Sequence, residues 1–501
     1  MDFTKHSDLV SADTVAFFKK SHKMLINGQW LDAFAGARLD VHDPSDEQKI
    51  GSVPAGDQQD IDLAVAAARA AFDHGPWHEM RPGQRERLLL KLADLVESNA
   101  QNLAEIESID NGKSVMVARY VDVALAADFF RYMAGWATKI EGSTNDVSVP
   151  FAPDSKFVAF TRKEPIGVVG AIIAWNFPLL LAAWKLGPAL ATGCTVVLKP
   201  AEQTPMSALR LGELIQEAGY PAGVVNIVTG YGQSAGAALA GHPGINKVTF
   251  TGSTEVGKLV GKLALENMTR ISLELGGKSP IVVLDDYDPA AAAAGAAQAI
   301  FFNAGQVCCA GSRLYVHKKI FDRVVSDLSD IAGKMKIGKG LDPSNDLGPL
   351  VSRTQMDRVC SYIGSGVQQG ATVVSGGSRS GTAGFFVQPT VLVDVNPKMR
   401  VVAEEIFGPV LVAMPYDDLD EVAAWANDTM YGLGASIWSN DLSRVHRLIP
   451  KIKAGTVWVN CHNILDSAMP FGGYKQSGFG REMGKASLDL FTESKSVIMS
   501  V

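Results

Sequence analysis

Apolar and polar positions follow two different rhythms along the chain. Between positions 84 and 100, Leu88, Leu92 and Leu95 recur at helical spacing, which predicts an amphipathic helix packed on a core. After position 165, short apolar runs typical of buried strands alternate with helical stretches. The strand-like runs of this series are 166–173, 195–200, 224–228 and 247–251. Such alternation predicts parallel strands connected by crossover helices.

A second alternating series follows and predicts a second α/β domain. Its elements include the apolar runs 271–275 and 280–284, a helix over 321–334 and a strand over 389–395. The glycine pair at 276–277 lies between the first two of these runs. We therefore expect the domain boundary near this pair.

The helix between the runs 195–200 and 224–228 carries its own end signals. Thr204 is a suitable N-cap before Pro205 at the first helical position. Gly219 can adopt the left-handed conformation that ends a helix. We therefore expect this helix to begin at Pro205 and to end at Gly219.

One long uncharged stretch tests whether the chain enters a membrane. Residues 166–184 carry no charge until Lys185, and their length approaches that of a membrane span. Asn176 and Pro178 interrupt the stretch, which favours a strand, a loop and a buried helix. The first twenty residues hold three aspartates and no arginine, which argues against a leader sequence. We expect no membrane partner.

Composition narrows the class of protein. A chain of 501 residues exceeds one usual hydrophobic core, and 47% hydrophobic with 20% charged residues is typical of a globular enzyme. The net charge of −7, with basic and acidic residues interspersed, offers no basic face to nucleic acid. The five cysteines form no CxxC pair and show no zinc-site spacing. We therefore expect a cytoplasmic protein without a metal, whose partners are small molecules and other subunits.

The segment FFNAGQVCCAGS contains the sharpest candidate for chemistry. A cysteine that follows a glycine turn can be surrounded by backbone amides that stabilise negative charge, which makes Cys308 a candidate nucleophile. The alternative, two buried cysteines in a loop, is more common on cysteine statistics alone. The segments around it decide between the two interpretations.

Further motifs agree in order and spacing with one known family. They are AWNFPL (174–179), FTGSTEVG (250–257), LELGGKSP (273–280), NGQW from Asn27, EEIFGPV from Glu404 and PFGGYKQSGFGRE from Pro470. Together with FFNAGQVC they resemble the NAD(P)-dependent aldehyde dehydrogenase superfamily over nearly the whole chain. The usual dinucleotide fingerprint GxGxxG is absent, and only a loose glycine pattern occurs at Gly230, Gly232 and Gly236.

The resemblance implies an α/β fold with three parts. These are a Rossmann-type NAD-binding domain over 1–145 and 167–276, an α/β catalytic domain over 277–485, and a small β element for oligomerisation over 146–166 and 486–501. A homo-oligomer is therefore expected, either a dimer or a tetramer.

The resemblance also assigns catalytic roles. Cys308 attacks the aldehyde to form a thiohemiacetal, and Asn176 stabilises the oxyanion together with the backbone N–H of Cys308. After hydride transfer to NAD, Glu274 acts as the general base that lets water hydrolyse the thioester, with a pKa raised by its apolar surroundings. Without the resemblance, Asn176 would be a turn residue and Glu274 a partner in a surface ion pair.

Cofactor contacts follow in the same way. Gly252 and Ser253 precede a helix that starts at Thr254, so its N-terminus can meet a diphosphate. Lys199 and Glu202 match the residues that hold the adenosine ribose, and the carboxylate favours NAD over NADP. The full set implied for the cofactor is Trp175, Lys199, Glu202, Gly232, Thr251, Gly252, Ser253, Glu405 and Phe407.

The aldehyde is expected to enter an apolar, partly aromatic tunnel. Its implied lining is Phe177, Leu181, Trp184, Phe302, Val307, Cys309, Leu465 and Phe471. The segments RYMAGWATKIEG, TRKEPIGVV and HNILDSAMPFGG look most like the branch of the family that oxidises phenylacetaldehyde. Aliphatic, long-chain or cinnamyl-type aldehydes, a thiol esterase and a non-catalytic scaffold are the alternatives, and the roles of Cys309, Cys461 and His462 stay open.

Overall fold

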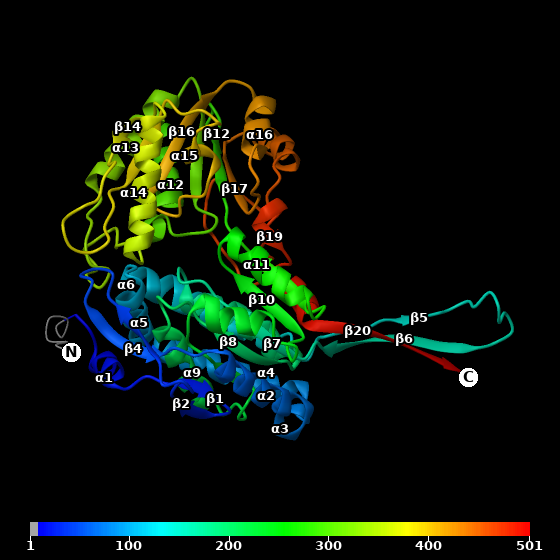
Figure 1. The fold of residues 1–501 in the computed structure, drawn as a ribbon. Coiled ribbons are helices and arrows are strands. Elements are labelled where there is room, and N and C mark those ends of the chain that lie inside the picture. Colours follow the sequence, from blue (N-terminus) through cyan, green and yellow to red (C-terminus); the bar gives the residue numbers. More distant parts are fainter. Residues whose placement is uncertain (1–8) are drawn as a thin grey trace.

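A computed structural model describes residues 9–501 and divides them between two main sheets and a projecting arm (Figure 1). The first sheet has eight strands, and its central part is parallel. In spatial order the strands are β19 (Gly478–Phe479), β11 (Arg270–Glu274), β10 (Lys247–Thr251), β7 (Val168–Ile172), β8 (Thr195–Lys199), β9 (Val225–Ile227), β1 (Met24–Ile26) and β2 (Gln29–Leu31). Strands β7, β8 and β10 are buried at every position, as expected for a parallel sheet covered on both faces.

Helices cover this sheet and carry the apolar spacing seen in the sequence. They include α1 (Ala12–Lys19), α2 (Gln58–Asp73), α4 (Pro82–Ser98), α5 (Ala100–Asn111), the π-helix η2 (Ala118–Val123), α7 (Ala124–Ala134), α8 (Pro178–Thr192), α9 (Met206–Ala218) and α11 (Thr254–Leu265). Every residue of α8 is buried, which explains why its sequence is uncharged apart from Lys185. The described residues contain no helix that is both long and apolar enough to cross a membrane.

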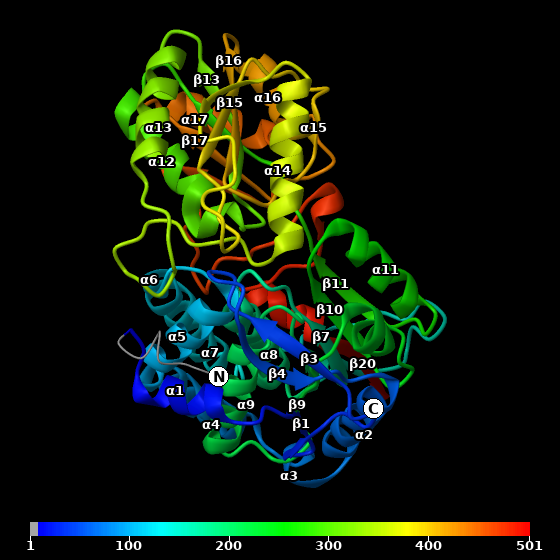
Figure 2. The same ribbon diagram turned by 60° about the vertical axis from the view of Figure 1, so that its left-hand side comes forward.

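The second sheet has seven strands and lies above the first in both views (Figures 1 and 2). In spatial order these are β14 (Thr372–Ser375), β15 (Thr390–Val393), β16 (Val410–Tyr416), β13 (Gly311–His317), β12 (Ser279–Val283), β17 (Gly434–Trp438) and β18 (Thr456–Val459). Its helices include α12 (Pro289–Phe301), α13 (Phe321–Lys334), α14 (Arg353–Gln368), α16 (Leu419–Asn427) and α17 (Leu442–Leu448). This arrangement confirms the predicted α/β fold class.

The arm is a three-stranded antiparallel sheet that projects from the body (Figure 1). It consists of β20 (Thr492–Ser500), β6 (Phe157–Pro165) and β5 (Thr144–Asn145). Residues 144–165 and the C-terminal strand, more than 300 positions apart in the sequence, therefore meet in one sheet. The domain boundaries stay a prediction, and β19, from the segment assigned to the catalytic domain, pairs with β11 of the first sheet.

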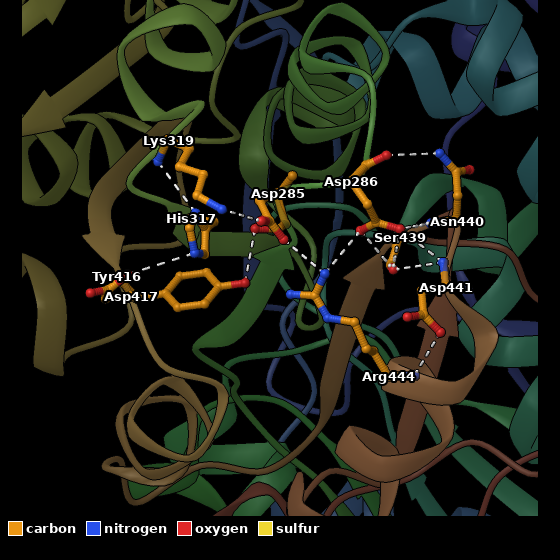
Figure 3. A network of polar contacts seen from close by, with 11 residues as sticks. Asp285, Asp286, His317, Lys319, Tyr416, Asp417, Ser439, Asn440, Asp441 and Arg444 are labelled. Carbon is orange, nitrogen blue, oxygen red and sulfur yellow. Dashed lines mark hydrogen bonds and ion pairs between the residues drawn. The ribbon is translucent and has the colours of Figure 1, made fainter.

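A polar network closes the carboxyl edge of the second sheet (Figure 3). The Asp286 carboxylate, just after β12, accepts hydrogen bonds from Ser439 Oγ at 2.9 Å and from the backbone N–H groups of Asn440 and Asp441, both at 2.8 Å. Arg444 Nη1 donates to Asp285 Oδ1 at 2.7 Å. The strand ends here are tied together by satisfied groups.

Local sequence signals were accurate in some places and wrong in one. Helix α13 spans the predicted 321–334, and Gly219 follows α9 with a φ of 93°. The predicted N-cap at Thr204 is wrong, because α9 begins at Met206 and Pro205 lies before it. The N–H of Met206 donates instead to Asp110 Oδ2 at 3.0 Å, and Thr204 Oγ1 donates to the carbonyl of Trp175.

Candidate active site

A cavity of about 200 Å³ lies where the carboxyl edge of the first sheet meets the amino edge of the second. It receives the loops after β7 and β10, the end of β11, and the segments before β12 and β13. Its walls include the three predicted catalytic residues, Cys308, Glu274 and Asn176, and every residue predicted for the substrate tunnel. Residues from segments more than a hundred positions apart thus face one space.

The Cys308 loop is held in an unusual backbone conformation. Asn303 and Ala304 both have a positive φ, 49° and 53°, and Gly305 follows with 71°. A Cβ at Gly305 would lie 2.1 Å from the carbonyl oxygen of Gly408, so only glycine fits there. The loop therefore turns sharply before Cys308, whose side chain is partly exposed.

The surroundings of the Cys308 thiol favour its protonated form. Its interaction with the Cys309 thiol, together with burial, holds its pKa well above the ordinary value. The sequence interpretation placed stabilising amides around a thiolate, but here the surroundings favour the neutral thiol. A base must therefore remove the proton when the aldehyde binds.

Glu274 ends strand β11 and points into the interior without a partner. It is 4% exposed, and neither carboxylate oxygen has a hydrogen-bond partner among residues 9–501. Burial, and then the nearby Glu482 carboxylate, raise the pKa of Glu274 well above the ordinary value. The alternative of a surface ion pair is excluded, and the direction of the expected pKa shift is as predicted.

Asn176 follows β7 and bridges to the cysteine loop. It is 4% exposed, and its Nδ2 donates to the carbonyl of Gln306 at 3.1 Å, two residues before Cys308. An amide group carries two N–H donors, so one remains for a further acceptor. The backbone carbonyl of Asn176 accepts hydrogen bonds from Lys113 Nζ and Asn303 Nδ2.

The predicted diphosphate site lies at the N-terminus of α11. Ser253 is the N-cap of this helix, and its Oγ accepts from the N–H of Val256. Thr251, Gly252 and Ser253 all line the cavity, and Thr251 Oγ1 is buried with no hydrogen-bond partner in the part of the chain that the structure describes. An unsatisfied hydroxyl beside a helix N-terminus fits an anionic ligand such as a dinucleotide.

The residues predicted for the adenosine end lie beyond the cavity wall. Lys199 ends β8 and its Nζ contacts Glu202 Oε2 at 3.2 Å, with Lys199 buried and Glu202 about one third exposed. Burial lowers the pKa of Lys199. Gly232 is exposed and has open space beside its Cα.

Glu405 and Phe407 are held by two residues that the sequence did not indicate. Gln355 and Arg358 of α14 donate to the carbonyls of Phe407 and Glu405 at 2.8 and 3.1 Å. The Phe407 ring meets Trp175 edge to face at 5.2 Å. Because Gln355 and Arg358 are three positions apart in a helix, the sequence could have predicted that they share one helix face. Nothing in the sequence indicated that this face contacts the segment of Glu405 and Phe407.

The Glu405 carboxylate lies among backbone atoms of the segment before β12. Its Oε1 accepts from the N–H of Gly277 at 2.9 Å, and burial raises its pKa to about 7. A Cβ at Gly276 would lie 2.2 Å from Glu405 Oε2. The absence of a side chain at Gly276 thus allows Glu405 to approach this closely.

Two pairs of aromatic rings line the apolar part of the cavity. Phe177 stacks on Phe302 with 6.3 Å between the ring centres, and Trp184 packs against Phe471 with 5.6 Å between the ring centres. Val121 of the π-helix and Leu125 of α7 also line it, although the sequence analysis did not select them. A π-helical turn has no recognisable sequence signal, so the sequence could not predict that Val121 and Leu125 both face the cavity.

Cys309 lines the cavity, whereas His462 is a buried structural residue. The two ring nitrogens of His462 contact Ser436 Oγ and the carbonyl of Cys309, and burial lowers its pKa to about 4. Within residues 9–501, no three His, Cys, Asp or Glu side chains are placed to hold a metal ion.

Around one cavity lie a thiol, an amide donor and a carboxylate that has no hydrogen-bond partner among residues 9–501, a combination of groups that suits covalent thiol catalysis. The chain belongs to the aldehyde dehydrogenase family, whose family model matches residues 30–497. This match confirms the family prediction and the assignment as an aldehyde dehydrogenase.

Individual relatives cover nearly the whole chain. A phenylacetaldehyde dehydrogenase of Pseudomonas fluorescens is 49% identical over 99% of both chains. A mitochondrial benzaldehyde dehydrogenase of Antirrhinum majus is 46% identical and covers 96% of this chain and 89% of its own. The NAD⁺ complex of an aldehyde dehydrogenase from Bacillus cereus has a TM-score of 0.96 at 47% identity, covering 98% of this chain and 99% of its own.

Proposed function

We propose that the protein oxidises an apolar aromatic aldehyde of the phenylacetaldehyde type to its carboxylic acid, with NAD as cofactor and water as the acyl acceptor. The observation that carries this proposal is the convergence of Cys308, Asn176 and Glu274 on one cavity with aromatic walls. The names of two relatives, which act on phenylacetaldehyde and benzaldehyde, support an aromatic substrate.

Covalent chemistry starts at Cys308. Its thiol releases a proton to solvent as the sulfur attacks the aldehyde carbon, and the resulting oxyanion is stabilised by the Asn176 amide and the backbone N–H of Cys308. NAD, when bound, supplies the hydride acceptor that converts the thiohemiacetal to a thioester. Glu274 then takes a proton from water, whose oxygen attacks the thioester carbon and releases the acid and the Cys308 thiol.

NAD as the cofactor is supported from two directions. The solved relative with NAD⁺ bound shares the fold over nearly its full length. In this chain, the Thr251 hydroxyl, the N-terminus of α11 and the Lys199–Glu202 pair offer groups for a diphosphate and a ribose. The Glu202 carboxylate can accept from both ribose hydroxyls and would repel a 2'-phosphate.

Formation of NADH from a panel of aldehydes tests the proposal. Phenylacetaldehyde and NAD should give NADH with a higher kcat/KM than acetaldehyde, because burial of an apolar group contributes about 1.5–3 kcal/mol. A thiol esterase would cleave an ester and form no NADH from aldehyde and NAD, and a scaffold would do neither. Equal kcat/KM for acetaldehyde and phenylacetaldehyde would remove the aromatic preference.

We also propose that the arm makes the protein a homo-oligomer in the cytoplasm. The arm exposes apolar side chains, with Ile498 63% and Met499 44% accessible, which suits burial against another subunit. All cysteines at 194, 308, 309, 360 and 461 are free, as expected in a reducing compartment. Light scattering on the protein with and without residues 492–501 tests the assembly.

A further inference from the structure

A buried ionic cluster lies directly behind the loop that carries Asn176. Lys113, Glu107 and Asp122 have fully buried side chains, and the Lys113 ammonium forms ion pairs with Glu107 Oε1 at 3.1 Å and with Asp122. Helix α5 ends at Asn111, and Gly112 follows with a φ of 88°, which turns Lys113 back toward the interior. None of these residues lines the cavity.

The Lys113 ammonium contacts three groups. It donates hydrogen bonds to the Asp122 carboxylate and to the backbone carbonyl of Asn176, the latter at 2.8 Å, and it forms an ion pair with the Glu107 carboxylate. The ammonium also lies 4.2 Å from the centre of the Phe177 ring. Burial alone would lower the pKa of Lys113, but Asp122 and Glu107 together raise it, so the charge is kept.

Neighbouring side chains hold the same loop from the same side. Asn111 Nδ2 donates to the carbonyl of Trp175 at 2.6 Å, and Glu107 Oε2 accepts from the N–H of Leu179 at 3.3 Å. The loop from Trp175 to Leu179 is thus fixed at its main chain by residues of α5 and the turn after it. Its side chains remain free to face the cavity.

The cluster also reaches the wall of the substrate tunnel. Asp122 belongs to the π-helix η2, and its neighbour Val121 lines the cavity, as does Leu125 one turn later. The Lys113–Asp122 ion pair therefore connects the tunnel wall with the backbone of the oxyanion donor.

We propose that Lys113 is a positioning residue of the reaction, which holds the Asn176 main chain so that its amide meets the oxyanion formed at Cys308. This inference rests on the proposed function, since it requires Asn176 to be the oxyanion donor. A buried ion pair gives little net stability compared with apolar packing, so its use here is to fix geometry. An error of about 1 Å in a catalytic group can reduce the rate by about 100-fold.

A double-mutant cycle between Lys113 and Asn176 tests the proposal. The kcat/KM for phenylacetaldehyde should fall about 10- to 100-fold in Lys113→Met, and about 100- to 1000-fold in Asn176→Ala. The double variant should be no slower than Asn176→Ala alone, because Lys113 acts only through Asn176. The dissociation constant for NAD, measured by fluorescence quenching, should stay within about twofold.

Further variants keep the test decisive if Lys113→Met does not fold. The charge-balanced variant Lys113→Met/Asp122→Asn replaces it in the same cycle, and Asn111→Ala should give a smaller loss in the same direction. Lys113→Arg keeps the charge, but its planar guanidinium cannot reproduce the geometry of these contacts, so it should not restore full activity. Full activity in Lys113→Arg would overturn the positioning role.

The matched control is Arg444→Met, which removes a cation from the remote Asp285–Asp286 cluster. It should leave kcat/KM within about twofold. If Asn176→Ala retains wild-type kcat/KM, the proposed function of Asn176 is wrong. If Asn176→Ala is slow but Lys113→Met reduces the rate equally in both backgrounds, Asn176 keeps its role and the positioning role of Lys113 is wrong.

Discussion

The two parallel sheets of this enzyme use their carboxyl edges in opposite ways. In the first sheet, the ends of β7, β8, β10 and β11 lead to Asn176, Lys199, Thr251 and Glu274. In the second, the ends of β12, β13, β16 and β17 lead into the polar network of Figure 3, away from the cavity. Its contribution to the site, Cys308, precedes β13 at the amino edge. In parallel sheets, ligands are expected at the carboxyl edges of the strands, and here only the first sheet places its carboxyl edge at the cavity. Function is therefore inferred from the residues of the site and not from the sheet topology.

The polar groups at the two edges differ in how they are satisfied. At the second sheet, Asp286 accepts from three donors and Asp285 pairs with Arg444. At the first, Thr251 Oγ1 and both oxygens of Glu274 are buried without partners in the described part of the chain. Such orphaned groups are unfavourable unless a ligand or water completes them, which is the state expected at a working site.

Removal of the nucleophile should have the largest effect. We expect Cys308→Ala to lower the rate of aldehyde oxidation by at least about 10⁴-fold, because the thioester forms on the Cys308 sulfur. The rate is followed by NADH absorbance, and unchanged thermal unfolding serves as the control for folding. Oxidation at more than about 1% of the wild-type rate would show that Cys308 is not the nucleophile.

Removal of the base should separate the two halves of the reaction. Glu274→Gln should form about one NADH per active site in a rapid burst, and steady turnover should then be about 10²- to 10⁴-fold slower than wild type. Stopped-flow absorbance measures both phases. A wild-type steady rate would assign deacylation to a different base.

The activity of the wild-type enzyme should be highest at alkaline pH. Burial and Glu482 raise the pKa of Glu274, and Cys309 and burial raise that of Cys308, so each group loses its proton at a higher pH than it would in water. Activity should therefore increase with pH, by about tenfold per unit where one ionisation limits the rate. A kcat that is flat between pH 6 and about 9 would contradict these directions.

Cofactor preference should respond more modestly. Glu202→Gln removes the charge that would repel a 2'-phosphate, and we expect the ratio of kcat/KM for NAD over NADP to fall about tenfold, or about 1.4 kcal/mol. The measurement compares both cofactors at a fixed aldehyde concentration. An unchanged ratio would separate Glu202 from the ribose site.

The polar network at the carboxyl edge of the second sheet should contribute to the stability of the fold but not to the reaction. Asp286→Ala removes the acceptor of three hydrogen bonds and should reduce the free energy of unfolding by about 1–3 kcal/mol. Denaturant unfolding measures this loss, and kcat/KM should stay within about twofold. A large fall in kcat/KM with unchanged stability would mean that the two edges do not differ as described.

Patterns that depend on neighbouring residues could be predicted from the sequence, and those that depend on distant ones could not. The spacing around 321–334 defines α13 because its apolar face is local, and Gly219 ends α9 by its own conformation. The N-cap at Thr204 failed because Asp110, almost a hundred residues earlier, supplies the acceptor for α9.

The same distinction between neighbouring and distant residues applies to the candidate site. Cys308, Asn176 and Glu274 can be selected as candidates from the sequence because each lies in a short motif, and the family resemblance predicts their roles. Lys113, Gln355 and Arg358 act on these motifs from other elements through main-chain carbonyls, a contact that any sequence can receive. Their positions became apparent only with the fold.

Covalent capture of the intermediate tests the account most directly. Glu274→Gln mixed with phenylacetaldehyde and NAD should gain the mass of one phenylacetyl group, and peptide mapping should place that group on Cys308. Absence of the acyl group after the NADH burst, or its presence on Cys309 instead, would contradict the account.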